Sequence, residues 1–340
     1  MRPLRFAMIG AGFWSRFQFD AWGEVPGAKC VAICDLDRSR AEQRAREGGI
    51  AAVYDDPMQL FGSESLDFVD IVTSAESHAG LVALAAQNRV AAICQKPLAP
   101  TLDEARRIVE GSVRSGVPLL VHENWRWQAP IRAVKQVLDA GTIGRVFRAR
   151  VQFANSFPVF QNQPFLKELD RFILVDIGTH ILDAARFLFG EATSLHCQTT
   201  RVNRDIRGED VATVMLAMGD AAVLCLMSYA SQVEHDRFPE TFLFVEGDQG
   251  SIELGPDFWL RVTTASGTTS HRITPTRYGW ADPVYDLVHA SIVPCHENLL
   301  QSLHGTGEAE TTGVDNLKTM RLVEAAYESA RTGRSVKVGD

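Results

Sequence analysis

The stretch LRFAMIGAGFWS, residues 4–15, decides the fold. An apolar run of strand character leads directly into Gly10 and Gly12, and a helix-forming segment follows. The first glycine permits a tight strand-to-helix turn, and the second lets the backbone approach a pyrophosphate at the positive end of the helix. Ser15 stands where a third glycine often sits, so a turn that merely requires glycine is the other interpretation. The stretch predicts a dinucleotide-binding loop.

An acidic residue after the second apolar run supports this interpretation. Asp35 ends residues 29–35, about 20 residues beyond the loop, where a carboxylate accepts both hydroxyls of an adenosine ribose. The same charge repels a 2′-phosphate, which favours NAD, although arginines just downstream keep NADP open. Phe13, Trp14, Arg38 and Lys96 complete the predicted cofactor-binding set.

The first third of the chain alternates strand-like and helix-like runs. The strand-like runs are rich in Val, Ile, Phe and Cys, and they cover residues 4–10, 29–35, 67–73, 91–95 and 118–123. Strands that alternate regularly with helices form a parallel sheet covered on both faces. We therefore predict that residues 1–123 form an NAD-binding Rossmann domain, a doubly wound α/β fold.

The hydrophobic pattern of the sequence changes from about Gly144. Segments with period-two patterning follow one another, separated by turns such as EGDQGS, residues 246–251. This pattern predicts a large, mostly antiparallel open sheet. A helix over residues 172–190 precedes most of these strands, and two closing helices are expected near residues 284–303 and 315–331. We predict that residues 124–340 form an α+β domain for substrate binding and oligomerisation.

Bulk properties exclude several classes of protein. A chain of 340 residues exceeds what one hydrophobic core usually serves. The net charge of -8 argues against nucleic-acid binding, and no apolar run approaches the roughly 20 residues of a membrane helix. The six cysteines are scattered without CxxC spacing, which predicts buried thiols and no metal site. The N-terminus turns directly into the glycine loop, so we expect no signal peptide and a cytoplasmic location.

Lys96 follows the fourth long apolar run, in AAICQKPLAPT, residues 91–101. Ligands of open parallel sheets bind at the carboxyl ends of the strands, so this cation is a candidate for holding a substrate oxygen during hydride transfer. A solvated loop lysine is the alternative.

HENWRWQAP, residues 122–130, reaches the same edge and offers Asn124 and Arg126 as substrate-binding donors. Packing, or pairing of Arg126 with an acid of the second domain, remains open.

A carboxylate and an imidazole interrupt the apolar segment FILVDIGTHILDAARFLFG, residues 172–190. Asp176 and His180 lie four residues apart and therefore share one face of a helix. We predict that His180 is the general base and that Asp176 orients it or binds a substrate hydroxyl. The alternatives are an N-cap role for Asp176 and a buried structural histidine. Asn155 lies on a strand that is expected to face the substrate.

Together these motifs resemble the glucose-fructose oxidoreductase and inositol dehydrogenase family, Gfo/Idh/MocA. GAGFWS, QKP, NWRW and DIGTH stand in family order across essentially the whole chain. The resemblance implies a Rossmann domain followed by a domain whose open sheet serves substrate binding and assembly into a dimer or tetramer. It also implies a sugar substrate and catalytic roles for Lys96, Asp176 and His180. Gln95 departs from the family glutamate.

Within the family, GFWSRFQ, ICQKP and HENWRWQ look most like D-apiose dehydrogenases. That resemblance implies oxidation of a branched pentose to its lactone with NAD, in a reaction that needs no metal. Three alternatives remain open: another sugar or inositol dehydrogenase, a keto-sugar reductase, and a non-catalytic dinucleotide sensor.

Overall fold

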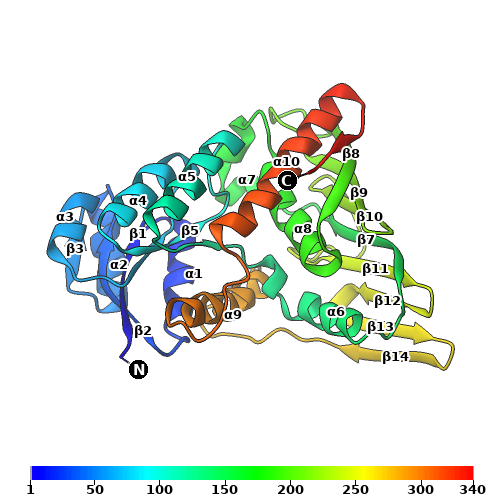
Figure 1. Ribbon diagram of the computed structural model, residues 1–340, viewed down its shortest axis with the longest axis horizontal. Helices are drawn as coiled ribbons and strands as arrows, with labels where there is room; N and C mark the ends of the chain where they lie inside the picture. The colour runs from blue at the N-terminus through cyan, green and yellow to red at the C-terminus, as the bar shows by residue number, and fades with distance from the viewer. Residues whose placement is uncertain (1, 340) are drawn as a thin grey trace. The chain divides into compact units, whose positions relative to one another are not determined.

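The computed structural model describes residues 2–339, which divide into two compact units (Figure 1). The first unit runs to Glu123 and also includes residues 279–281 and 292–318. The second unit comprises residues 124–278, 282–291 and the chain from Thr319. The assignment of functional domains to residues 1–123 and 124–340 stays a prediction.

The first unit is built on one parallel sheet with the strand order β3-β2-β1-β4-β5-β6. Its strands are β1 Leu4–Ile9, β2 Ala28–Cys34, β3 Ala52–Tyr54, β4 Phe68–Ile71, β5 Ala91–Gln95 and β6 Leu119–His122. Its helices are α1 Phe13–Trp22, α2 Arg38–Gly48, α3 Pro57–Ser63, α4 Ala75–Gln87 and α5 Leu102–Ser115. The predicted doubly wound fold is confirmed; the three-residue strand β3 was not predicted because it is too short for a periodic pattern.

Local signals set the helix boundaries in the first unit. The side chain of Asp37 caps α2 by accepting a hydrogen bond from the backbone of Ser39, and Thr101 caps α5 by accepting from Glu104. Gly49 and Gly116 end these two helices in the left-handed conformation. The strands between the helices are largely buried, and β4 is buried along its whole length. Such strands require cover on both faces.

The second unit contains a nine-stranded sheet with the order β14-β13-β12-β11-β7-β10-β9-β8-β15. The strands are β7 Val146–Ala154, β8 Ala192–Thr200, β9 Val211–Met218, β10 Ala221–Ser228, β11 Phe242–Gly247, β12 Gly250–Gly255, β13 Trp259–Thr264, β14 Gly267–Arg272 and β15 Val336–Lys337. All its pairs are antiparallel except β7 with β10. The predicted antiparallel sheet is confirmed. Strand β14 was not predicted, because it is polar and exposed.

Helices of the second unit cover one face of this sheet. The remaining elements are η1 Trp125–Trp127, α6 Ala129–Asp139, α7 Val159–Asn162, η2 Pro164–Glu168, α8 Ile173–Phe189 and η3 Pro256–Phe258, followed by α9 Asp286–Leu303 and α10 Gly313–Thr332, which contribute to both units. Helix α8 contacts β7, β9 and β10, and α6 contacts β12 and β13. The two closing helices are confirmed. No helix within residues 2–339 combines the length and apolar character that crossing a membrane requires.

Candidate active site

The glycine loop between β1 and α1 has the geometry that a pyrophosphate site requires. Gly10 has a φ of +107°, and a Cβ atom there would lie 2.2 Å from the carbonyl oxygen of Val72. At Gly12 a Cβ atom would meet no described atom within 4 Å, so the backbone is open to an approaching group. Within α1 the first turn carries neither an acidic residue nor a side-chain cap. Such a helix end fits the diphosphate of NAD.

Asp35 directly follows β2 and ties its carboxylate to the loop backbone. Its Oδ2 accepts a hydrogen bond from the N–H of Ala11 at 2.6 Å, and its Oδ1 accepts one from the N–H of Asp37 at 2.8 Å. A carboxylate oxygen has two lone pairs, so each can accept a ribose hydroxyl in addition. The loop and Asp35 therefore fit the adenosine half of NAD together.

The other predicted cofactor residues lie near this loop or at the start of α2. Phe13 is half exposed and meets Phe17 edge-on, with 5.4 Å between ring centroids. Trp14 also packs against Phe17, at 5.9 Å. Arg38 is exposed and pairs with Glu42 at 3.0 Å. Their contacts with a cofactor stay predictions.

Lys96 lies in the turn after β5, and hydrogen bonds with neighbouring side chains hold this turn. It is half-buried, and its backbone N–H donates to Oε1 of Gln95 at 2.8 Å. The imidazole of His78 is fully buried in α4 and contacts the carbonyl oxygens of Leu98 and Thr73, each at 3.2 Å. Burial lowers the pKa of His78. The imidazole joins the loops that follow β4 and β5 at the carboxyl edge of the sheet.

Asp176 lies in the first turn of α8. The helix begins at Ile173, so the interpretation of Asp176 as its N-cap is wrong. Oδ2 of Asp176 accepts a hydrogen bond from the hydroxyl of Tyr229 at 3.0 Å. Burial, together with this carboxylate, raises the pKa of Tyr229 well above its usual value. Tyr229 therefore stays protonated and remains a hydrogen-bond donor to Asp176.

His180 lies one helical turn beyond Asp176 and is 6% exposed. Its ring stacks on the indole of Trp125, with 4.5 Å between centroids and 19° between the planes. The indole is itself held, because its Nε1 donates to the hydroxyl of Thr241 at 3.0 Å. The second unit thus brings Asp176 and His180 together on one helix and restrains both side chains. Lys96 belongs to the first unit.

Asn155 follows β7 and is 1% exposed. Its Oδ1 accepts from the backbone N–H of Phe157 at 3.0 Å, whereas its Nδ2 has no hydrogen-bond partner within residues 2–339. A buried donor without a partner is costly, so this amide fits a ligand oxygen. Phe157 stacks on Phe238 at 4.0 Å and meets Tyr285 edge-on at 5.6 Å, which gives Asn155 an aromatic neighbour group.

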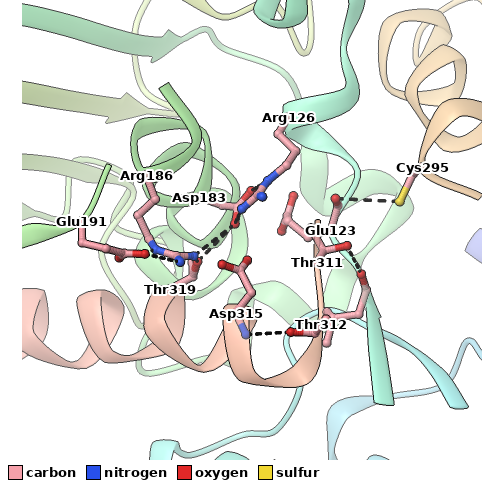
Figure 2. Close-up of polar contacts among 11 residues, drawn as sticks. Glu123, Arg126, Asp183, Arg186, Glu191, Cys295, Thr311, Thr312, Asp315 and Thr319 are labelled. Atoms are coloured by element: carbon pink, nitrogen blue, oxygen red, sulfur yellow. Dashed lines mark hydrogen bonds and ion pairs between the residues drawn. The ribbon is translucent and has the colours of Figure 1, made fainter. Parts of the chain in front are cut away.

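Asn124 and Arg126 make buried contacts inside the second unit. Nδ2 of Asn124 donates to the hydroxyl of Ser291 at 2.9 Å. Arg126 binds Asp183 in a bidentate pair, with Nε to Oδ2 at 2.8 Å and Nη2 to Oδ1 at 2.6 Å (Figure 2). The pairing with an acid that the sequence left open is therefore present. Substrate binding by Asn124 and Arg126 stays a prediction.

The two units also match known protein families. Residues 4–123 match the oxidoreductase family with an NAD-binding Rossmann fold, and residues 131–253 match the GFO/IDH/MocA C-terminal domain. The chain belongs to the Gfo/Idh/MocA family. It is thus an NAD-dependent oxidoreductase, as the glycine loop and Asp35 predicted.

Relatives within this family match over the full length of the chain. A D-apiose dehydrogenase of Paraburkholderia graminis is 46% identical over 339 residues, which cover 99% of this chain and 90% of the relative. A D-apiose dehydrogenase of Rhizobium rhizogenes is 43% identical over 340 residues, which cover 100% of this chain and 99% of the relative. A solved oxidoreductase from Agrobacterium radiobacter, in complex with NAD+, L-tartaric acid and magnesium, is 43% identical. It has a TM-score of 0.97 over 99% of this chain and 98% of its own.

Three residues that support the predicted site through hydrogen bonds were not found from the sequence. Tyr229 binds Asp176, Gln18 binds Gln95 beside Lys96, and Asp70 binds Gln18. Asp70 had a signal, because a carboxylate in the middle of an apolar strand requires partners. Tyr229 and Gln18 had none, because nothing in their neighbouring residues indicates what they contact.

Proposed function

We propose that this protein is an NAD-dependent sugar dehydrogenase that oxidises D-apiose to its lactone. The full-length identity to two D-apiose dehydrogenases carries the proposal. Three features of the chain support it: a loop that fits NAD, a carboxylate and an imidazole one turn apart on α8, and the buried amide nitrogen of Asn155, which has no hydrogen-bond partner within residues 2–339.

Oxidation of a hemiacetal removes a hydride from carbon and a proton from the hydroxyl oxygen, and a carbonyl forms. NAD, when bound, accepts the hydride with both electrons of the C–H bond. We propose His180 as the group that takes the proton, because an imidazole accepts one readily near neutral pH. The stacking on Trp125 holds the ring in one plane, which reduces the entropy lost when the substrate is bound productively.

Lys96 and Asp176 serve the same reaction in this proposal. The ammonium group of Lys96 holds the reacting oxygen and stabilises the negative charge that develops on it. Asp176 is oriented by Tyr229 and accepts a neighbouring hydroxyl or orients His180. Nδ2 of Asn155 donates to a sugar oxygen. Asn124 and Arg126 act as donors for the substrate if their buried contacts open.

A substrate panel tests the proposal. Pentoses, hexoses and inositols are supplied with NAD or NADP, and NADH or NADPH formation is followed by absorbance. We expect kcat/KM for D-apiose to exceed that for the linear aldoses by about 100-fold, with a lactone as product. NAD is expected to be preferred because Asp35 repels a 2′-phosphate. Preference for an inositol or a linear aldose would contradict the substrate. Tight NADH binding without turnover of any sugar would favour the dinucleotide sensor.

We also propose that the protein is a cytoplasmic homo-oligomer, a dimer or tetramer, assembled through the uncovered face of the nine-stranded sheet. Met215 is 48% exposed on this face. The same cross-strand row continues through Leu224, Arg150 and Phe244, and its two further apolar side chains are half-buried. Apolar side chains that remain accessible on a sheet face are typical of an interface. None of the six cysteines forms a disulfide within residues 2–339, which suits a reducing compartment.

Light scattering measures the assembly. We expect Leu224→Arg to lower the molar mass to that of a single chain, because a second guanidinium beside Arg150 places like charges together at the interface, which costs several kcal/mol. Gln59→Arg, at an exposed position of α3 in the first unit, is the matched control and leaves the mass unchanged. A monomeric wild type would contradict the proposed interface. Recovery outside the cytoplasmic fraction of lysed cells would contradict the location.

A further inference from the structure

A chain of hydrogen bonds inside the first unit leads from a buried carboxylate to the backbone of Lys96. Oδ1 of Asp70, on β4, accepts from Nε2 of Gln18 at 2.7 Å. Oε1 of Gln18 accepts from Nε2 of Gln95 at 2.9 Å, and Oε1 of Gln95 accepts from the N–H of Lys96 at 2.8 Å. Asp70 and Gln18 are 0% exposed, and Gln95 is half-buried. We call these three side chains the Asp70 chain.

Both ends of the Asp70 chain determine its direction. An ionised carboxylate only accepts hydrogen bonds, and a backbone N–H only donates them. The amide nitrogen of Gln18 must therefore face Asp70, and the amide oxygen of Gln95 must face Lys96. The remaining oxygen of Gln18 then meets the remaining nitrogen of Gln95, so every contact joins a donor to an acceptor. Two amides in sequence satisfy this pattern.

The donor-to-acceptor direction of the hydrogen bonds in the Asp70 chain explains why position 95 carries glutamine instead of the family glutamate. A carboxylate at this position would turn an oxygen toward Oε1 of Gln18, which is an acceptor. Rotating the amide of Gln18 would relieve that contact but would direct its oxygen at Asp70. Because Gln18 is fully buried, water does not relieve the conflict. One acceptor would face another for as long as both carboxylates are ionised.

Within the described part of the chain, no cation lies beside Asp70 to neutralise its charge, so its hydrogen-bond donors alone stabilise the ionised carboxylate. Its Oδ2 accepts from Nε1 of Trp22 at 2.8 Å, and that indole stacks on the buried imidazole of His296 at 3.8 Å. Burial lowers the pKa of His296 well below its usual value, so the ring is neutral. The other titratable side chains near Asp70 are Cys30 on β2 and Cys94 on β5. Burial raises the pKa of both thiols, that of Cys30 to about 12.

Burial also acts on Asp70 itself. It raises the pKa of this carboxyl to about 7, whereas the hydrogen bonds from Trp22 and Gln18 lower it. The two donors therefore favour the ionised form that burial opposes. The sheet places Met8 and Ile93 beside Asp70 on the neighbouring strands, so apolar residues complete the surroundings.

We propose that Gln95 is a positioning residue: the Asp70 chain holds the backbone of Lys96 at the end of β5 and so sets where its ammonium group reaches the substrate. The inference rests on the catalytic role proposed for Lys96. It assigns a use to the neutral side chain at position 95, which passes a hydrogen bond on to Gln18 as a carboxylate cannot.

A double-mutant cycle tests the direction of the chain. Gln95→Glu places one acceptor against another, and Asp70→Asn places one donor against another. In the double variant the reversed chain is complete, because the new amide at position 70 donates to Gln18, and Gln18 donates to the new carboxylate at position 95. That carboxylate still accepts from the N–H of Lys96. We expect each single variant to lower the melting temperature by about 5 °C and kcat by about tenfold. The double variant returns to within about twofold of the wild-type kcat.

The pH dependence separates this mechanism from a general loss of stability. In Gln95→Glu a single proton, on Asp70 or on the introduced carboxylate, restores a donor, so the carboxyl pair has a raised pKa in the folded protein. A raised pKa stabilises the folded state at low pH, and this contribution is lost as the pH rises through the folded value. The melting temperature of Gln95→Glu should therefore fall further below that of the wild type as the pH rises from about 6 to about 9. The double variant should show no such additional fall.

Four outcomes decide the inference, and Gln59→Glu in α3 is the matched control for adding a carboxylate at an exposed glutamine. A Gln95→Glu variant that behaves like the wild type at both pH values would overturn it. So would a double variant no better than the worse single one. Rescue of the melting temperature without rescue of kcat would contradict positioning. Rescue of both supports it. Melting requires no substrate, and the wild-type substrate panel tests the proposed function separately.

Discussion

Replacing Lys96 by methionine lowers kcat by about a thousandfold, the largest effect that we expect from a single side chain. Methionine keeps an unbranched stem of similar length but removes the ammonium group. The negative charge that develops on the substrate oxygen then loses its cation at the moment of hydride transfer. Binding of the cofactor should persist, because the glycine loop and Asp35 are unchanged. Steady-state kinetics with the best sugar of the panel, together with NADH fluorescence titration, measure both quantities.

Two further variants make the Lys96 experiment specific. Lys96→Arg keeps the charge but changes its shape, so we expect it to retain more activity than Lys96→Met. Lys29→Met removes an exposed lysine of the same unit and should leave kcat unchanged. Near-wild-type turnover of Lys96→Met would show that this lysine does not act on the substrate.

Replacing Asp183 by asparagine should lower the melting temperature of the protein by about 10 °C. Asp183 and Arg126 are 1% and 6% exposed at their side chains, and both contacts of their pair are shorter than 3 Å. Removing the carboxylate charge leaves a buried guanidinium without its counter-ion, which typically costs about 3–5 kcal/mol. The hydroxyl of Thr319, which also donates to Asp183, would lose part of its acceptor (Figure 2).

The matched control is a salt bridge on the surface of the same unit. Asp220 pairs with Arg145 at 3.2 Å, and their side chains are 73% and 69% exposed. Asp220→Asn should change the free energy of unfolding by no more than about 0.5 kcal/mol, because water screens an exposed pair. Calorimetric melting compares the two variants. If Asp183→Asn lowered the melting temperature as little as Asp220→Asn does, burial of the Arg126–Asp183 pair would not determine its contribution to stability.

Most of the first unit was predictable from the sequence, because its signals are local. The glycine loop, the acid at position 35 and the alternation of strands with helices each depend on a few neighbouring residues. The second sheet was predictable as a type, since period-two patterning indicates strands. Its order was not, because β7 pairs with β10 and β11, which are distant in the chain.

The candidate site divides in the same way. The spacing of Asp176 and His180 placed both on one helix, but the first residue of that helix depended on tertiary packing, so the N-cap interpretation failed. The sequence alone determined which chemical groups are present and which local elements carry them. Only the tertiary structure decided their partners: Asp183 for Arg126, Tyr229 for Asp176, and Gln18 with Asp70 for Gln95. These partners are 52 to 77 residues apart, beyond the range over which neighbouring residues constrain one another.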